Sequence, residues 1–421
     1  MTTIAVVGAS LAGISAARAL SAQGYRGRLV IIGDEGRRPY DRPPLSKNFL
    51  AGRITAADLA LESDDEQLEA EWLLGVAATG LDTRRRVISC SDGRTVAYDS
   101  AIIATGSRAR VLPAAAGFEN VHTLRTLEDA QRLKEQLVPG RRLVVVGAGF
   151  VGAEVAATAR GIGMDVTLIG SGAFPLSGPL GMQMGALIGR LHEDNGVKLI
   201  SSARVASFVC EDATAGNGRT ASAVRLADGR TVPADVVVLG LGSVPNTDWL
   251  TGSGLDLTDG IRCDAAGRTG VRGVFAVGDC AAWFDDRSGA YERDEHWTGA
   301  MERAGRAVAA LLADAAAAHD APTGTGPGAL DLPYFWSDQY GARLQFAGSA
   351  SDADSVEIEA GDPAEHSFLA VYYRAGEAVA ILGVNQPRLF TRWRKALTGA
   401  TPNKRVPPGR ETGATSLSPV C

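Results

Sequence analysis

The chain has 421 residues, of which 45 % are apolar and 21 % charged, and its formal net charge at pH 7 is −6. This length is too great for one hydrophobic core and suits two or three domains of an ordinary globular protein. No basic leader is evident, and no segment reaches the roughly 20 consecutive apolar residues that cross a bilayer. With an acidic balance and few aromatic residues, the composition predicts a cytoplasmic protein that binds no membrane and no nucleic acid.

The first predicted element is a buried strand, Ile4–Val7, that runs into the turn Gly8-Ala9-Ser10-Leu11-Ala12-Gly13 and an alanine-rich helix. The free N–H groups and dipole of such a helix N-terminus suit a pyrophosphate. A strand at Leu29–Ile32 then ends at Asp34 and Glu35. Both lie about 20 residues past the last glycine, where a carboxylate would hold an adenosine ribose; a charged strand end is the alternative.

The loop Arg37–Lys47 is stiffened by Pro43 and Pro44, and Ser46-Lys47 follows where a helix could begin. Lysine is rare in this chain, which makes Lys47 notable. We predict that Lys47 donates a hydrogen bond to the reactive edge of an isoalloxazine ring and favours its reduced, anionic form; a solvated surface lysine is the alternative. A strand at Ser100–Ala104, closing on Thr105-Gly106, completes this half of the site.

A second glycine-rich turn follows about 140 residues later. A helix at Leu127–Leu137 and a strand at Leu143–Val146 precede Gly147-Ala148-Gly149-Phe150-Val151-Gly152, which opens another helix. A strand at Val166–Ile169 and a linker at Gly170–Gly181 come next. Two turns in the same strand–turn–helix context predict two dinucleotides, most often a flavin and a nicotinamide that exchange a hydride.

Two features of this second unit bear on nicotinamide chemistry. Glu154, two residues past Gly152, would repel a phosphate; it either pairs with Lys47 and positions the nicotinamide or is a simple helix N-terminal charge. The second strand ends at Ile169-Gly170-Ser171-Gly172 without the carboxylate that holds an NADH ribose and repels a 2′-phosphate. We predict that NADH is preferred over NADPH, but with weak discrimination.

The strand Val236–Leu239 and the run Gly273–Asp279 return the chain to the first domain. Asp279 either accepts hydrogen bonds from the ribityl hydroxyls of a flavin or caps a helix. The turns Asp92–Arg94 and Asp228–Arg230 predict β-hairpins. The remaining predicted elements are a helix at about 298–316, a linker at Ala321–Ala329, strands at Arg343–Phe346, Phe368–Tyr373 and Ala378–Val384, and a loose end at Thr401–Cys421.

Several segments together resemble the FAD-containing, NADH-dependent ferredoxin reductases of bacterial oxygenase and cytochrome P450 systems. The resemblance covers nearly the whole chain and is carried above all by PYDRPPLSK (39–47) and FWSDQ (335–339), with GAGFVGAEVAA (147–157), GVFAVGDCA (273–281) and EHWTGAMERAG (295–305). Ser10 replaces a glycine of the family's first turn, and Gly299 stands where the family usually has asparagine.

The resemblance implies an α/β fold of the glutathione-reductase type, with two Rossmann-like dinucleotide-binding domains and a small α+β C-terminal domain. The predicted boundaries are 1–111 and 239–325 for a discontinuous FAD-binding domain, 112–238 for the NAD(P)H-binding domain, and 326–421 for the C-terminal interface domain. The implied enzyme is an FAD-dependent NAD(P)H:ferredoxin oxidoreductase (EC 1.18.1.-), a monomer or homodimer.

The resemblance and the turns together define the predicted site. The FAD-binding set is Gly8, Ser10, Ala12, Gly13, Asp34, Glu35, Arg42, Lys47, Val76, Ala104, Thr105, Gly106, Arg125, Gly278, Asp279 and Trp297. The NAD(P)H-binding set is Gly147, Gly149, Phe150, Val151, Gly152, Glu154 and Gly242. Lys47 and Glu154 are the implied catalytic pair, meeting beside the flavin, and no metal site is predicted.

The expected partner is a [2Fe–2S] ferredoxin, an acidic protein. The segment Arg388–Arg410 has seven basic residues and no acidic one, which favours a docking patch; a solvated tail is the alternative. The predicted docking residues are Trp336, implied by the resemblance, with Arg388, Arg392 and Arg394.

Cysteine usage narrows the choice among related flavoenzymes. The five cysteines include no Cys-x₄-Cys pair and none in the 40–47 region, which argues against the glutathione reductase, NADH peroxidase and coenzyme A disulfide reductase types. A rubredoxin reductase, an NADH oxidase, and an NADH-sensing signalling flavoprotein that resembles apoptosis-inducing factor remain as alternatives.

Overall fold

The computed structural model describes residues 2–63, 65–66, 68–210, 219–286, 288–317 and 332–398. The predicted linker Ala321–Ala329 and the end Thr401–Cys421 lie outside these residues. The chain divides into two units. The first comprises Met1–Arg42, Thr55–Arg108 and Ser243–Asp331, and the second comprises Pro43–Ile54, Ala109–Gly242 and Leu332–Cys421. Within the described residues, no helix is both long and apolar enough to span a bilayer.

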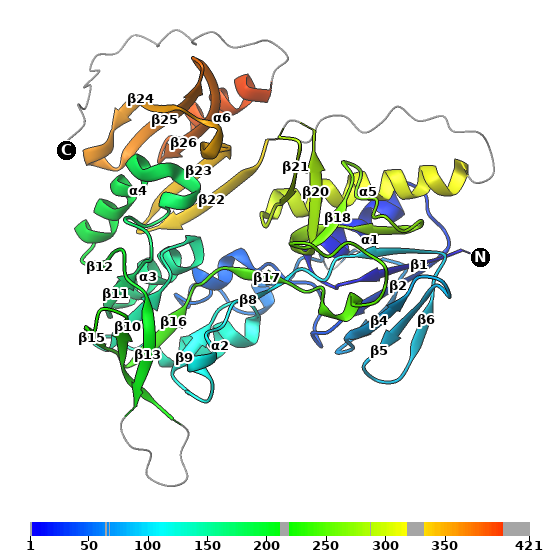
Figure 1. Ribbon diagram of the computed structural model, residues 1–421, viewed down its shortest axis with the longest axis horizontal. Coiled ribbons are helices and arrows are strands. Elements are labelled where there is room, and N and C mark those ends of the chain that lie inside the picture. Colours follow the sequence, from blue (N-terminus) through cyan, green and yellow to red (C-terminus); the bar gives the residue numbers. More distant parts are fainter. Residues whose placement is uncertain are drawn as a thin grey trace. The chain divides into compact units, whose positions relative to one another are not determined.

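A parallel five-stranded sheet forms the centre of the first unit, with the strand order β3-β2-β1-β7-β19. Its strands are β1 (Thr3–Val7), β2 (Arg28–Gly33), β3 (Glu71–Leu74), β7 (Ser100–Ile103) and β19 (Val274–Ala276). The helices α1 (Leu11–Ala22) and α5 (Trp297–Ala317) pack against each other (Figure 1). Because the strands are buried on both faces, they read in the sequence as continuous apolar runs rather than as alternating ones.

The second unit contains a parallel five-stranded sheet of matching order, β12-β11-β10-β16-β9. Its strands are β9 (Val121–Thr123), β10 (Arg142–Val146), β11 (Asp165–Ile169), β12 (Lys198–Ile200) and β16 (Val236–Leu239). The helix α2 (Leu127–Gln136) precedes β10, and α3 (Phe150–Ile162) follows it. In both units the glycine-rich turn follows the central strand, β1 or β10, which is the topological switch point where open α/β sheets bind ligands.

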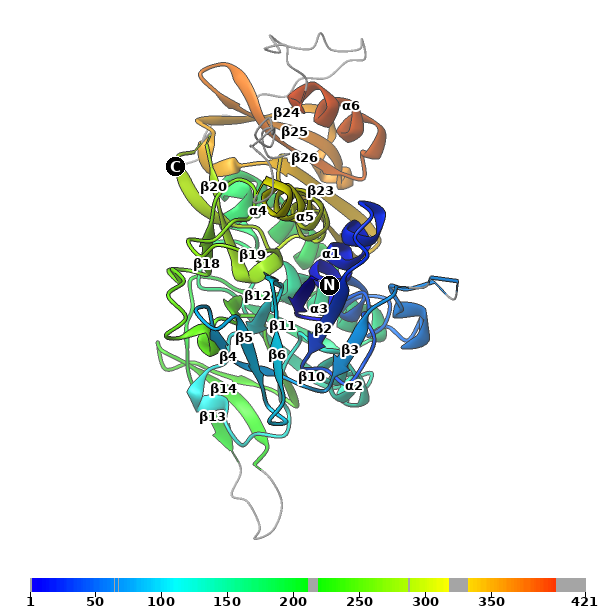
Figure 2. The same cartoon turned by 90° about the vertical axis from the view of Figure 1, so that its right-hand side faces the viewer.

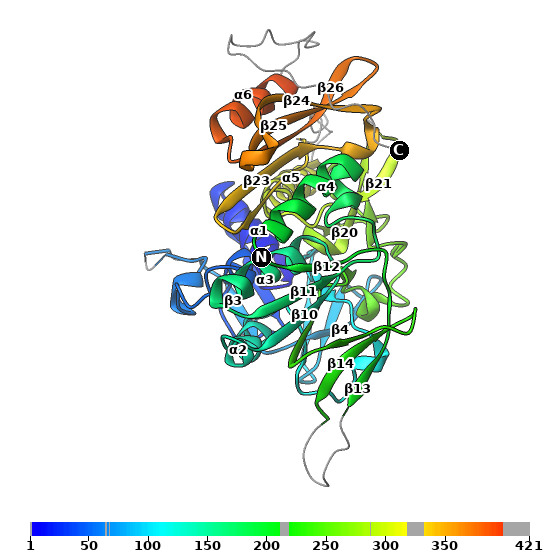
Figure 3. The same cartoon turned by 90° about the vertical axis from the view of Figure 1, so that its left-hand side faces the viewer.

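The helix α4 (Ser177–Asp194) corrects one prediction. The sequence predicts a linker over Gly170–Gly181, but the helix already begins at Ser177 and is kinked at Gly181, where φ is 77°. Several glycines obscure the helical pattern of this segment in the sequence. The helix nevertheless buries one stripe of apolar residues, Leu180, Met184, Ile188 and Leu191. This stripe packs against one face of the C-terminal sheet, and that burial stabilises a helix whose intrinsic propensity is low (Figure 3).

The C-terminal sheet is antiparallel, with the strand order β22-β23-β26-β25-β24. The strands are β22 (Tyr334–Gln339), β23 (Ala342–Gly348), β24 (Ser355–Asp362), β25 (Ser367–Arg374) and β26 (Glu377–Val384). A further helix that the sequence analysis did not predict, α6 (Pro387–Thr398), buries Phe390 and Trp393 on the face opposite to α4 (Figure 1). The sheet is therefore covered on both sides.

Shorter strands complete the two units. In the first unit, an antiparallel sheet (Figure 2) consists of β4 (Ala78–Asp82), β5 (Val87–Cys90) and β6 (Thr95–Ala97). A mixed sheet consists of β18 (Ile261–Cys263), β20 (Ala281–Asp285) and β21 (Ala290–Arg293), with β18 parallel and β21 antiparallel to β20. The strand β8 (Ser107–Ala109) pairs with β17 (Ser243–Pro245). In the second unit, β13 (Val205–Cys210), β14 (Ala221–Leu226) and β15 (Thr231–Pro233) form a further antiparallel sheet. The hairpins predicted at Asp92–Arg94 and Asp228–Arg230 are confirmed, since they join β5 to β6 and β14 to β15.

An ion pair at the start of the second parallel sheet makes stability depend on pH. Asp235 accepts hydrogen bonds from the backbone N–H and the guanidinium of Arg142, and these hydrogen bonds lower the pKa of Asp235 to about 2. A depressed carboxyl pKa adds stability that is present above about pH 4 and is lost as the pH falls toward about 2. We expect Asp235→Asn to lower the free energy of unfolding at pH 6 by about 1 kcal/mol, allowing for solvent screening.

Denaturant unfolding at pH 6 and at pH 3 checks this. The difference between wild type and Asp235→Asn should shrink at pH 3, while the exposed Asp286→Asn should match wild type at both. An equal difference at the two pH values would contradict the assignment.

Candidate active site

The first glycine turn is closed by very tight backbone contacts. Gly8 has φ +120°, and a Cβ at this position would lie 2.0 Å from the carbonyl oxygen of Ala104. A Cβ on Gly13 would lie 1.8 Å from the carbonyl oxygen of Gly8. Only glycine permits this packing, which sets the N-terminus of α1 directly above the end of β1.

The second turn repeats the arrangement. Gly147 has φ +109°, and its Cβ would lie 2.0 Å from the carbonyl oxygen of Gly240; a Cβ on Gly152 would lie 1.9 Å from that of Gly147. A Cβ on Gly149, by contrast, would meet no atom within 4 Å. Gly149 thus borders open space at the N-terminus of α3, where the backbone can approach a pyrophosphate. Val151, in the first turn of α3, is 41 % exposed.

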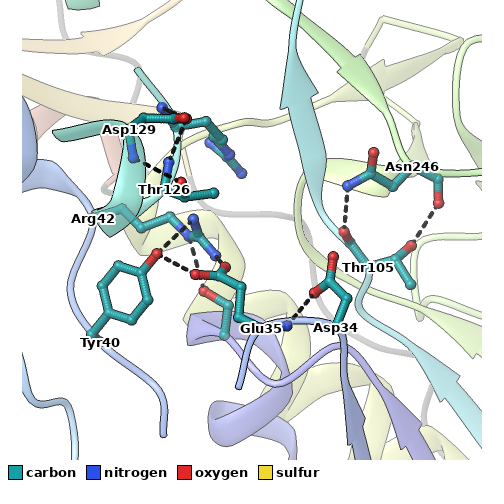
Figure 4. Close-up of polar contacts among 10 residues, drawn as sticks. Asp34, Glu35, Tyr40, Arg42, Thr105, Thr126, Asp129 and Asn246 are labelled. Carbon is teal, nitrogen blue, oxygen red and sulfur yellow. Dashed lines mark hydrogen bonds and ion pairs between the residues drawn. The ribbon is translucent and has the colours of Figure 1, made fainter. Parts of the chain in front are cut away.

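Arg42 lies beside the first turn, within a polar cluster (Figure 4). Its guanidinium Nη2 is 2.5 Å from Oε1 of Glu35, and its Nε donates to Oγ of Ser10 at 3.2 Å. Tyr40 donates to the other carboxylate oxygen of Glu35 at 2.6 Å. Burial works against the charge of Arg42, but Tyr40 and Glu35 outweigh it and raise the pKa of the guanidinium. Ser10, which replaces a glycine of the family's first turn, therefore supplies a hydrogen-bond acceptor that helps to hold Arg42.

The two carboxylates at the end of β2 are engaged differently. Glu35 is taken by Arg42 and Tyr40, whereas Asp34 is exposed and accepts a hydrogen bond from the backbone N–H of Glu35 at 3.1 Å (Figure 4). Val76, a further predicted FAD contact, is buried and bonded through its N–H to the carbonyl of Gly33.

The remaining predicted FAD contacts of the first unit come from three other segments. Asp279 accepts from Ser107 Oγ at 3.0 Å; it lies within a short 3₁₀ helix, not at its N-cap, so the capping alternative is wrong. Gly278 approaches Ala12 so closely that a Cβ on Gly278 would lie 2.8 Å from that of Ala12. Thr105 exchanges hydrogen bonds with Asn246 (Figure 4), and Trp297 donates to Asp41 at 2.9 Å.

The structure also explains Gly299. A Cβ on Gly299 would lie 2.0 Å from Oδ2 of Asp294, whose other oxygen accepts from the N–H of His296 at 3.0 Å. Asp294 also lies 3.7 Å from the guanidinium of Arg303. The carboxylate of Asp294 fills the room that an asparagine side chain at 299 would need.

Lys47 and Glu154 form a buried ion pair in the second unit. Lys47 Nζ is 2.7 Å from Glu154 Oε2, and the two side chains are only 14 % and 6 % exposed. Ser46 Oγ donates to the same carboxylate oxygen at 2.5 Å, and Thr158 of α3 donates to the carbonyl of Ser46 at 2.8 Å. The sequence allowed Glu154 either to pair with Lys47 or to act as a simple charge at the helix N-terminus. In the structure it pairs with Lys47, and the catalytic role of this pair remains a prediction.

Other predicted residues of the second unit have different surroundings. Arg125 precedes a capping box at the start of α2, where Thr126 and Asp129 bond reciprocally (Figure 4). Gly242 has φ +83° and open space around its Cβ position, and the Phe150 ring packs edge-on against Phe335 at 4.3 Å. Arg125 and Lys47 are the two predicted FAD contacts that belong to the second unit.

Sequence reasoning missed two side chains that hold Glu154, namely Ser46 and Ser337. Both lie inside the motifs PYDRPPLSK and FWSDQ that carried the resemblance, so the signal was present without an assigned role. Tyr40, Asp41 and Asn246 were missed in the same way as polar partners in the first unit.

Comparisons with known proteins identify the family of this chain. Residues 2–309 match the model of the pyridine nucleotide-disulphide oxidoreductase family, and residues 334–406 match the reductase C-terminal domain. The chain therefore belongs to the pyridine nucleotide-disulphide oxidoreductases, and the α/β fold predicted from the sequence is confirmed.

Its relatives include named reductases. Putidaredoxin reductase CamA of Pseudomonas putida is 34 % identical over 405 residues, covering 95 % of this chain and 92 % of the relative. The biphenyl dioxygenase system ferredoxin–NAD(+) reductase component of Paraburkholderia xenovorans is 35 % identical over 391 residues (92 % and 91 %). The crystal structure of the covalent putidaredoxin reductase–putidaredoxin complex matches with a TM-score of 0.87 at 33 % identity, covering 94 % of this chain and 93 % of that one. The resemblance seen in the sequence is confirmed.

The two kinds of glycine in the second turn predict opposite phenotypes. Gly149→Ala has room in the protein, so we expect the melting temperature to stay within about 2 °C while the affinity for NAD⁺ falls roughly tenfold. Gly147→Ala combines a positive φ with a backbone clash, so we expect about 2 kcal/mol or more of destabilisation.

Calorimetric titration with NAD⁺ and thermal unfolding measure the two effects. Gly161→Ala, also without neighbours within 4 Å but near the far end of α3, is the matched control and should retain wild-type affinity. Equal NAD⁺ affinity in Gly149→Ala and wild type would contradict the assignment of this turn.

Proposed function

We propose that the chain is an electron-transfer flavoenzyme that takes a hydride from NAD(P)H and passes single electrons to a [2Fe–2S] ferredoxin of a cytochrome P450 or dioxygenase system. The observation that carries this proposal is the duplication of the glycine turn. Each unit has a parallel sheet whose central strand leads into a turn that only glycine can form, beneath a helix N-terminus. Two such turns suit two dinucleotides.

The first unit provides groups that fit FAD. Gly8 and Gly13 shape the turn, and the N-terminus of α1 offers free N–H groups to the pyrophosphate. Asp34 is the carboxylate left to accept from the adenosine ribose, because Glu35 is held by Arg42 and Tyr40. When bound, FAD would supply the redox chemistry that links two-electron uptake from the nicotinamide to one-electron transfer to the acceptor. We propose Asp279, placed after β19, as the acceptor for the ribityl hydroxyls.

In the second unit, Gly147, Gly149 and Gly152 would hold the pyrophosphate of NAD(P)H. Lys47 and Glu154 are the proposed catalytic pair. The ammonium of Lys47 also donates to the carbonyl of Pro43 at 3.0 Å, so its position is fixed from two sides. With FAD bound, the remaining N–H of Lys47 would donate a hydrogen bond to the reactive edge of the flavin, while Glu154 would keep the lysine side chain in place.

The cysteines support an electron acceptor outside the chain. No Cys-x₄-Cys pair exists in the sequence, and burial raises the pKa of both Cys263 and Cys280, which disfavours their thiolates. Because the Cys-x₄-Cys pair of the disulfide reductases is missing, we propose that the electrons pass directly to a separate protein or molecule. The relatives named as ferredoxin reductases support a ferredoxin in that role.

One face of the C-terminal sheet suits this partner. The exposed Arg388, Arg392 and Lys395 lie four and three residues apart on one face of α6. The guanidinium of Arg394 lies 4.3 Å from the centre of the Tyr334 ring, which stacks on Trp336. We propose that these cations and Trp336 form the docking surface for an acidic ferredoxin.

The central experiment is an anaerobic titration of the FAD-loaded protein with NADH and, separately, with NADPH, followed by a [2Fe–2S] ferredoxin. Bleaching of the flavin followed by reduction of the ferredoxin supports the proposal. Flavin that bleaches but is re-oxidised only by oxygen would replace it with an NADH oxidase or a signalling flavoprotein.

Charge reversal on α6 tests the docking surface. We expect Arg388→Glu with Arg392→Glu to raise the KM for ferredoxin about tenfold or more while NADH–ferricyanide activity stays constant, because ferricyanide needs no docking. The exposed Arg225→Glu on β14 is the matched control. An unchanged KM for ferredoxin would refute this surface.

Nucleotide preference tests the missing carboxylate. The turn after β11 is Gly170-Ser171-Gly172, and Ser201 and Ser202 follow β12, so no acidic side chain in these segments repels a 2′-phosphate. We expect kcat/KM for NADH to exceed that for NADPH only modestly. A preference above about a thousandfold, roughly 4 kcal/mol, would contradict this.

A further inference from the structure

A continuous buried polar chain leads from Glu154 into the C-terminal sheet. Glu154 Oε2 is occupied by Lys47 and Ser46, and its other oxygen, Oε1, accepts a hydrogen bond from Ser337 Oγ at 2.7 Å. Ser337 belongs to β22 and is fully buried. Gln339, two residues further along the same face of the strand and 1 % exposed, donates through Nε2 to Ser337 Oγ at 3.0 Å.

His192 of α4 lies near Gln339, at the end of this chain of hydrogen bonds. His192 is fully buried, and its Nδ1 lies 2.7 Å from the hydroxyl of Tyr340. Its Nε2 and the Oε1 of Gln339 are both buried, and neither makes a hydrogen bond within the described residues. Burial lowers the pKa of His192 to about 4, and the neighbouring side chain of Gln339 opposes that shift only in part. His192 is therefore neutral at pH 7.

Chemistry fixes the direction of the two links nearest to Glu154. A carboxylate only accepts, so Ser337 must donate to Glu154, and the hydroxyl oxygen of Ser337 then accepts from the amide of Gln339. The hydroxyl of Tyr340 lies 2.7 Å from Nδ1 of His192, where a neutral imidazole nitrogen can accept a hydrogen bond. Burial raises the pKa of Tyr340, so its hydroxyl keeps the proton that this requires.

We propose that Ser337 and Gln339 are positioning residues for the reaction, since they hold the carboxylate of Glu154 in the one orientation that fixes the ammonium of Lys47. This inference rests on the proposed function. Three donors, from Ser46, Lys47 and Ser337, occupy both oxygens of a carboxylate that is almost fully buried. Removal of the Ser337 hydroxyl leaves one oxygen without a partner and lets the carboxylate rotate.

The test compares Ser337→Ala with Ser337→Thr, which keeps the hydroxyl, in the FAD-loaded enzyme. We expect Ser337→Ala to lower kcat for NADH–ferricyanide turnover about tenfold, with a smaller change in KM, and to alter the dissociation constant of NAD⁺ measured by calorimetry. Ser337→Thr should recover most of kcat. Gln339→Met, which removes the donor to Ser337, should produce a weaker loss of the same kind.

Two controls isolate the positioning role. Ser355→Ala, an exposed serine of the same sheet, should match wild type. In a Glu154→Gln background, adding Ser337→Ala should cost less than about twofold, because the group that it positions has already been changed. Provided that the wild-type protein turns over NADH, either of two results would overturn the inference. One is a Ser337→Ala variant with the kcat and NAD⁺ affinity of the wild type. The other is a Ser337→Ala change that lowers kcat as much in the Glu154→Gln background as in the wild type. A wild-type protein that fails to oxidise NADH would instead overturn the proposed function.

Discussion

A buried carboxylate must be matched by donors, and this requirement organises the second unit around Glu154. Leaving such a group unpaired costs several kcal/mol, so each of its oxygens has to find a partner. The partners of this α3 side chain come from two distant stretches of sequence: Ser46 and Lys47 from the proline-stiffened loop, and Ser337 from β22. One side chain thus ties the loop, the helix α3 and the C-terminal sheet together.

The rest of the site depends on backbone close approach rather than on side-chain chemistry. In both glycine turns the chain passes so close to a neighbouring carbonyl that a Cβ would lie about 2 Å from it. The two sheets have corresponding strand orders, and each places its turn at the same point of the topology. The two units differ in their polar side chains. The first unit has the guanidinium of Arg42, held by Ser10 and Glu35, and the second has the Lys47–Glu154 pair.

Local patterns predicted most of the fold. Buried parallel strands such as β1 and β10 are continuous apolar runs, and glycine turns follow them directly, so both were found from sequence. The helices α4 and α6 were missed, because glycines interrupt the first and arginines dominate the second; tertiary burial of Met184 and Trp393 stabilises them. The hydrogen bond between Ser337 and Glu154 joins residues 183 positions apart, and no local pattern reveals such a contact.

The strand β22 presents different side chains on its two faces. Tyr334 and Trp336 lie on the α6 side, whereas Phe335, Ser337 and Gln339 are buried on the other. Its pairing with β23 sets Ser337 opposite Leu344, and a slip of one residue would exchange the two faces. An insertion or deletion of one residue within β22 would therefore expose its buried face and destabilise the sheet. If the acceptor docks on α6 and the outer face as proposed, variants of this reductase would adapt to a new partner by substitutions there, while the inner face of β22 stays fixed.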